Sequence, residues 1–111
     1  MNSLGSTLRK LREEKQLPLR IVAAYLDIDQ AILSRIERGQ RKATRDQVTK
    51  LAGYFNVKED ELIVSWLSDK IVYALADEQN AIEALKVAGE KIKYHTKKKN
   101  NEFRTTKTKT N

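Results

Sequence analysis

The chain contains no cysteine, one proline and one histidine among its 111 residues. Without cysteine there is neither a disulfide nor a thiolate metal site, which is typical of an intracellular, cytoplasmic protein. The only histidine, His95, stands in a lysine-rich segment without other ligands nearby, so we expect no metal and no cofactor. Long apolar runs are missing too, and the first residues lack the apolar region of a signal peptide, so we expect no membrane partner.

Groups that catalysis requires are also scarce. There is no glycine-rich phosphate loop, and no Ser/His/Asp set can be assembled around the single histidine. The acidic run Glu59, Asp60 and Glu61 comes at the expected start of a helix, where carboxylates stabilise the helix dipole. We therefore predict a protein that is not an enzyme.

Charge is present in excess and is distributed unevenly. The net charge is +7 and the isoelectric point is about 9.7. The net charges of residues 1–57, 58–94 and 95–111 are +5, −3 and +5. A basic chain favours anionic partners such as DNA, RNA or an acidic membrane surface. This uneven distribution of charge predicts that an anionic partner contacts the first half of the chain and its tail.

Apolar residues recur at helical spacing, and no segment shows the alternation of a strand. The spacing predicts helices over about 7–16, 18–26, 30–38, 45–55, 58–76 and 78–94. Ser6 or Thr7 is expected to cap the first helix, and Asp77 the last. From His95 onward the chain is too polar to bury a core, so the sequence predicts a disordered basic tail.

Local signals divide the first half of the chain into short helices. Asp27 tolerates a left-handed turn, and Asp29 is a good N-cap for the helix that follows. Gly39 is the expected end of that helix. Thr44, with Gln47 three residues later, forms a capping box. Two short helices with a turn of three or four residues between them, in a basic segment, are typical of a helix-turn-helix.

The most specific sequence pattern runs through the third and fourth predicted helices. It consists of Leu33-Ser34-Arg35-Ile36-Glu37-Arg38-Gly39, then Arg41, then Val48-Thr49-Lys50-Leu51-Ala52. This pattern resembles the phage-repressor family (Cro/cI, or Xre) of helix-turn-helix transcriptional regulators, over roughly residues 4–67. The resemblance implies an all-α domain of four to five helices that binds double-stranded DNA. It also implies that Gln30–Arg38 is the recognition helix, which lies in the major groove.

The expected contacts follow from the resemblance and from side-chain chemistry. Glutamine pairs with adenine, arginine with guanine, and small or aliphatic side chains contact the thymine methyl group. The groove-facing positions are Gln30, Ala31, Ile32, Ser34 and Arg35. Cations that follow on the loop are expected to contact phosphates: Arg38, Arg41 and Lys42. By contrast, Glu37 faces inward and is expected to be structural.

Four positions depart from the family pattern. Asp27 occupies the turn position where the family usually has glycine, and Ala43 stands where a loop proline is usual. Pro18 and Leu19 replace a frequent Ser-Gln pair whose glutamine contacts phosphate. Arg20 is the expected substitute for that phosphate contact.

The chain is expected to divide into three parts. Residues 1–67 form the DNA-binding domain, residues 68–94 a helical extension and residues 95–111 the basic tail. Ile82, Leu85, Gly89 and Ile92 follow one another in steps of three and four, which is typical of a packing seam. We therefore predict a homodimer formed through the extension, bound to an operator that is an inverted repeat.

Other uses of the same fold stay open at this point. One is an antitoxin or another regulator that binds a protein partner through its C-terminal region. Another is a controller of a restriction-modification gene cluster. RNA binding is an alternative with less support than either of these, because the aromatic platforms of RNA-binding modules are missing.

Overall fold

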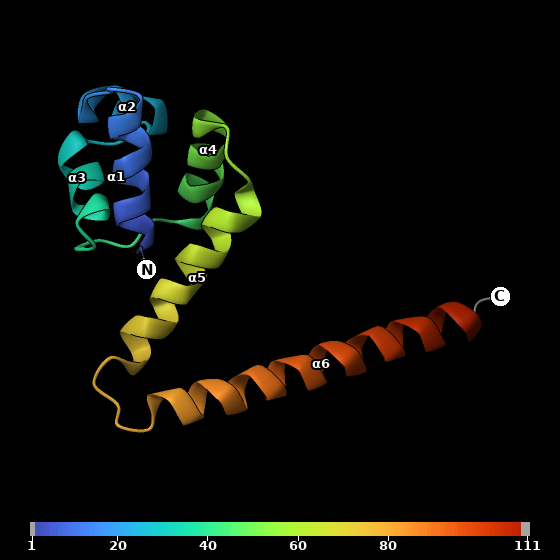
Figure 1. Ribbon diagram of the computed structural model, residues 1–111. Helices are drawn as coiled ribbons and strands as arrows, with labels where there is room; N and C mark the ends of the chain where they lie inside the picture. The colour runs from blue at the N-terminus through green and yellow to red at the C-terminus, as the bar shows by residue number, and fades with distance from the viewer. Residues whose placement is uncertain (1, 110–111) are drawn as a thin grey trace. The chain divides into compact units, whose positions relative to one another are not determined.

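The computed structural model describes the backbone of residues 2–109 and the side chains of residues 2–99. Within this range the protein is all-helical, as predicted, and contains no strand (Figure 1). Its helices are α1 (Leu4–Glu14), α2 (Leu19–Leu26), α3 (Gln30–Glu37), α4 (Arg45–Phe55), α5 (Glu59–Leu75) and α6 (Ala81–Lys109). The chain divides into two compact units, Met1–Ala74 and Leu75–Asn111.

The first unit has one hydrophobic core, shared by α1 to α4 and the start of α5. α1 and α2 pack against α3, and α2 also contacts α4 (Figure 1). The predicted apolar stripe of α4 is fully buried, and so are the inward faces of α2 and α3. The core residues are Leu4, Leu8, Val22, Ala23, Leu26, Leu33, Ile36, Ala43, Val48, Leu51, Ala52, Phe55 and Leu62.

The start of α1 differs from the prediction. Ser3 is the N-cap and accepts a hydrogen bond from the backbone N–H of Ser6, so the expected caps at Ser6 and Thr7 are wrong. The N–H of Leu4 donates to the carboxylate of Asp69 in α5, at 2.8 Å. This contact joins the start of α1 to α5, and no local signal in the sequence predicts it.

The left-handed turn after α2, the glycine after α3 and the cap of α4 are those that the sequence predicts. Asp27 has the left-handed conformation, with φ of 56°, and Gly39 has φ of 75° after the end of α3. The Thr44–Gln47 capping box forms with both of its hydrogen bonds. Pro18 is the N-cap of α2, one position before the helix, although we expected it to be the first helical residue.

The first half of α5 belongs to the core of the first unit. Leu62 is buried, and Ile63 and Trp66 pack against the core. The indole N–H of Trp66 donates to the carbonyl of Ala43 at 2.7 Å, which ties the loop before α4 to this helix. Further along α5, Val72 is exposed. The core contacts of α5 therefore lie in its first half, while Asp69 in its second half accepts the hydrogen bond from Leu4.

The second unit differs from the prediction at both ends of its helix. α6 begins at Ala81, so Asp77 is not its N-cap, and residues 76–80 form the turn after α5. The helix also continues through the segment from His95 to Lys109, which we expected to be disordered. Polarity shows only that a segment lacks a core. An existing helix gains one hydrogen bond for each residue added, so it can extend even where its residues bury no core.

No helix in the described part of the chain is long and apolar enough to cross a membrane.

Candidate nucleic-acid interface

α3 has one buried face and one face open to solvent. Leu33, Ile36 and Glu37 are buried, as predicted from their spacing. Gln30, Ala31 and Arg35 are exposed on the other side of the helix, and Ser34 is half-buried. Ile32, also predicted to face the groove, is half-buried and packs against the core. Four of the five predicted positions thus form the outward face, and Ile32 lies at its edge.

The turn before α3 is held by short-range hydrogen bonds. The backbone N–H groups of Asp27 and Ile28 donate hydrogen bonds to carbonyls at the end of α2, at 3.1 and 3.0 Å. The carboxylate of Asp29 then accepts from the N–H of Ala31 at 3.1 Å and caps α3. Asp27 occupies the position where the family usually has glycine, and its backbone adopts the left-handed conformation that glycine would adopt there. The departure therefore leaves the turn intact.

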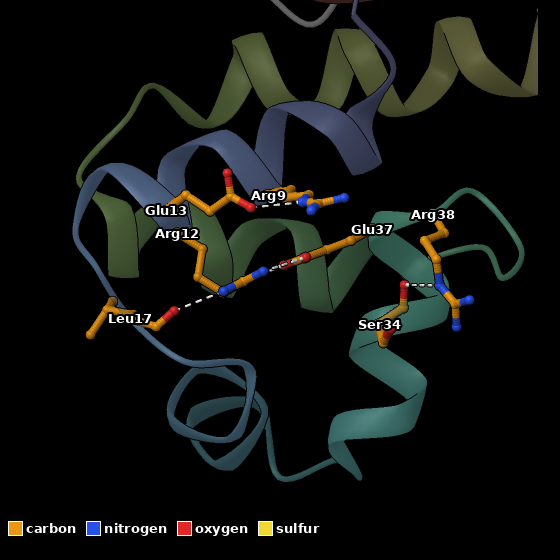
Figure 2. Close-up of polar contacts among 7 residues, drawn as sticks. All are labelled: Arg9, Arg12, Glu13, Leu17, Ser34, Glu37 and Arg38. Atoms are coloured by element: carbon orange, nitrogen blue, oxygen red, sulfur yellow. Dashed lines mark hydrogen bonds and ion pairs between the residues drawn. The ribbon is translucent and has the colours of Figure 1, made fainter.

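A buried ion pair fixes the other end of α3. Arg12 of α1 donates two hydrogen bonds to the carboxylate of Glu37, from Nε at 2.8 Å and from Nη2 at 2.9 Å (Figure 2). Their side chains are only 12% and 5% exposed. This hydrogen-bonded pairing raises the pKa of Arg12 above its ordinary value, despite the opposing effect of desolvation. The remaining Nη1 donates to the carbonyl of Leu17, just before α2.

Arg12 was missing from the predicted site residues, although one signal pointed to it. An inward-facing glutamate needs a partner, because an unpaired buried carboxylate is costly. Glu37 was recognised as inward-facing, but its partner stands 25 positions earlier in the chain. Several arginines precede α3, and sequence spacing alone does not choose among them. Arg12 acts on the interface by positioning α3 and does not itself lie on the outward face.

The predicted phosphate contacts are all exposed cations. Arg38 donates from Nε to the carbonyl of Ser34 at 3.4 Å, which directs its side chain back along α3 (Figure 2). The Nζ of Lys42 lies 4.7 Å from the centroid of the Tyr73 ring, a cation–π contact. These cations, from α2, the end of α3 and the loop after it, are Arg20, Arg38, Arg41 and Lys42. Arg35, predicted to face the groove, is also an exposed cation.

The loop that carries two of these cations is anchored at its end. Ala43 is buried, and its carbonyl accepts from Trp66. The Trp66 ring in turn has the guanidinium of Arg45 at 5.2 Å and the ammonium of Lys70 at 3.5 Å from its centroid. Arg41 and Lys42 therefore project from a loop whose backbone is fixed by the core. Sequence reasoning assigned Trp66 to the core and did not foresee this anchoring.

A short helix with a fixed buried face, a polar outward face and neighbouring exposed cations defines a DNA-binding protein of the helix-turn-helix class. Residues 8–62, about half of the chain, match the family model described as Helix-turn-helix. The chain belongs to this family, with the repressor-like helical fold of the Cro/cI and Xre type. Its activity is DNA binding in the regulation of transcription, and the family is not one of enzymes. No curated protein and no solved structure matches the chain significantly.

Proposed function

We propose that this regulator recognises its operator with α3 in the major groove, as a homodimer on an inverted repeat. The observation that supports the groove assignment is the division of α3 into two faces. Its inner face is locked by the core and by the Arg12–Glu37 pair, while its outer face presents uncharged polar and basic side chains. A rigid helix with that exposed face is the element that a major groove admits.

The outer face holds the chemistry for reading bases. Arg35 is exposed and its guanidinium has the two-pronged geometry that pairs with the O6 and N7 atoms of guanine. Gln30 at the start of the helix pairs with the N6 and N7 atoms of adenine. Ala31 and the edge of Ile32 contact thymine methyl groups, and Ser34 contacts either kind of base. Different residues of α3 would therefore specify different base pairs of one half-site.

Exposed cations around α3 supply affinity and register. Arg20 projects from α2, Arg38 from the end of α3, and Arg41 and Lys42 from the anchored loop. Contacts with phosphates hold a protein in one orientation on the duplex but carry no sequence information directly. Substitutions of these residues should weaken binding to all DNA, in contrast to substitutions on the outer face of α3.

The dimer is proposed to form through α6. Ile82, Leu85 and Ile92 share a face of this helix with Gly89, and they are 80%, 44% and 64% exposed within the single chain. A helix with an apolar face is stabilised when that face is buried against another surface. Two subunits would then bind half-sites of opposite direction, because the duplex backbone has local two-fold symmetry.

Selection of bound sequences from a random duplex library tests both parts of the proposal. We expect an inverted repeat whose half-site centres lie about 10 base pairs, or a multiple of that, apart. The Arg35→Ala variant should select the same repeat with one base pair relaxed in each half-site. Enrichment of a single, unrepeated half-site would refute the dimer, and an unchanged selection with Arg35→Ala and Gln30→Ala would refute reading by α3.

A further inference from the structure

The apolar face of α6 is short and ends within the described side chains. It begins at Ile82, continues through Leu85 and Gly89, and ends at Ile92. The next position on the same face is Thr96, and all residues from Lys91 to Lys99 are exposed. The face therefore covers only about three turns of the helix. A partner for so short a face must match it closely in both shape and charge.

Charge is segregated along this unit. Residues 77–83 contain three carboxylates and no basic residue: Asp77, Glu78 and Glu83. Residues 91–99 contain five lysines and no carboxylate: Lys91, Lys93, Lys97, Lys98 and Lys99. Packed helices lie about 8–10 Å apart, which is close to the Debye length in physiological salt. Two parallel copies would place lysines beside lysines, whereas two antiparallel copies would place lysines beside carboxylates.

Gly89 adds an argument from shape. Among the residues that the structure describes, a Cβ atom at this position would meet nothing within 4 Å, so no contact in this part of the subunit explains the glycine. Glycine is unfavourable in the middle of a helix, and its missing side chain leaves a hollow on the face. Antiparallel pairing places Leu85 of each copy opposite that hollow in the other, and Ile82 opposite Ile92. Parallel pairing would instead leave two hollows facing each other.

From charge and shape together we propose that two copies of α6 pair antiparallel, with Leu85 of each seated against Gly89 of the other. This inference rests on the homodimer of the proposed function and specifies its geometry. The occupant of the apolar face is thus a second copy of the chain. Its direction is determined by the carboxylates at and just before the start of α6 and by the lysines that follow the apolar face.

Disulfide cross-linking tests the direction of pairing, because the chain has no cysteine of its own. Ile82→Cys and Ile92→Cys are introduced into two separately tagged chains, which are mixed and oxidised. The two positions are ten residues apart, or about 15 Å along one helix, whereas a disulfide requires Cα atoms within about 7 Å. We expect the mixed disulfide and little symmetric product.

A second variant tests the charge argument independently of cysteine. Replacing Lys97, Lys98 and Lys99 together by glutamate should weaken dimerisation on the order of tenfold at low salt, because like charges would then face each other. In a parallel pair the same replacement would exchange lysines beside lysines for glutamates beside glutamates, so dimerisation would change little. The size of the loss, measured by sedimentation, therefore separates the two directions.

The remaining outcomes are also decisive. Symmetric disulfides in each single variant would overturn the antiparallel geometry, and so would a wild-type dimer in which neither kind of disulfide forms. A wild-type chain that is monomeric at high micromolar concentration would instead refute the homodimer of the proposed function. Sedimentation of the unmodified protein makes the two failures distinguishable, and base reading by α3 is tested separately by the library selection.

Discussion

Arg12 and Glu37 make a two-point contact that joins α1 to the last turn of α3. Both carboxylate oxygens of Glu37 are engaged, at 2.8 and 2.9 Å, and the third nitrogen group of Arg12 reaches the carbonyl of Leu17. The guanidinium thus connects three elements: the first helix, the entry to the second and the end of the third. Because α3 carries the proposed base contacts, this contact links the stability of the domain to the orientation of its DNA-binding face.

Removal of one partner of this pair should be costly. Glu37→Ala leaves the guanidinium of Arg12 largely buried without its counter-ion, so we expect a loss of about 3 kcal/mol in the free energy of unfolding. Urea unfolding gives the measurement. The double replacement Arg12→Met with Glu37→Leu removes both charges and should recover most of the loss. A double variant as unstable as Glu37→Ala would contradict this explanation.

Gly5 is expected to be essential for packing. A Cβ atom at this position would lie 2.5 Å from the carbonyl oxygens of Ile36 and Glu37, which are backbone atoms and cannot rotate away. Gly5→Ala should therefore destabilise the protein by about 1–3 kcal/mol, because α1 must move away from α3. Gly53→Ala is the matched control, since a Cβ there meets nothing within 4 Å in the described part of the chain. It should stabilise α4 by roughly 0.5–1 kcal/mol. Equal thermal melting of the two variants would show that α1 does not approach α3 so closely.

Arg35 should contribute sequence preference as well as affinity. If it pairs with guanine in two-point fashion, Arg35→Ala should cost about 1–3 kcal/mol on the selected operator and relax one base pair. Lys50→Ala, which removes an exposed cation of α4 paired with Asp46, serves as the control for loss of charge. Titration of operator and scrambled duplexes at one salt concentration gives the comparison. A uniform loss on both duplexes would make Arg35 a phosphate contact.

The Arg9–Glu13 pair on α1 should be visible in an acid titration. The hydrogen bond from Arg9 Nε, at 2.8 Å, lowers the pKa of Glu13 below its ordinary value. A depressed carboxyl pKa stabilises the folded protein at pH values above the unfolded pKa, and that contribution is lost as the pH falls through the folded pKa. Carboxyl NMR titration of wild type and Arg9→Ala tests this. The Glu13 midpoint should rise in the variant, and an unchanged midpoint would contradict the pairing.

Much of the first unit was predictable because its signals act over short distances. The left-handed Asp27, the cap at Asp29 and the Thr44–Gln47 box each depend on residues within a few positions, and all three form. Apolar spacing likewise predicted the buried faces of α3 and α4. The family resemblance implied that Gln30 and Arg35 face outward from α3, and both are exposed there.

The sequence by itself therefore determined the all-helical class, the turn before α3 and the residues of its outward face, because caps and periodicity are local. Tertiary structure alone decided that the N–H of Leu4 binds Asp69, that Gly5 meets α3, and that Arg12 is the partner of Glu37. Each of these depends on contacts between elements, up to 65 positions apart for Leu4 and Asp69. Many pairings of comparable chemistry are open to an unfolded chain. Only the packing of the core selects the one that brings both groups together.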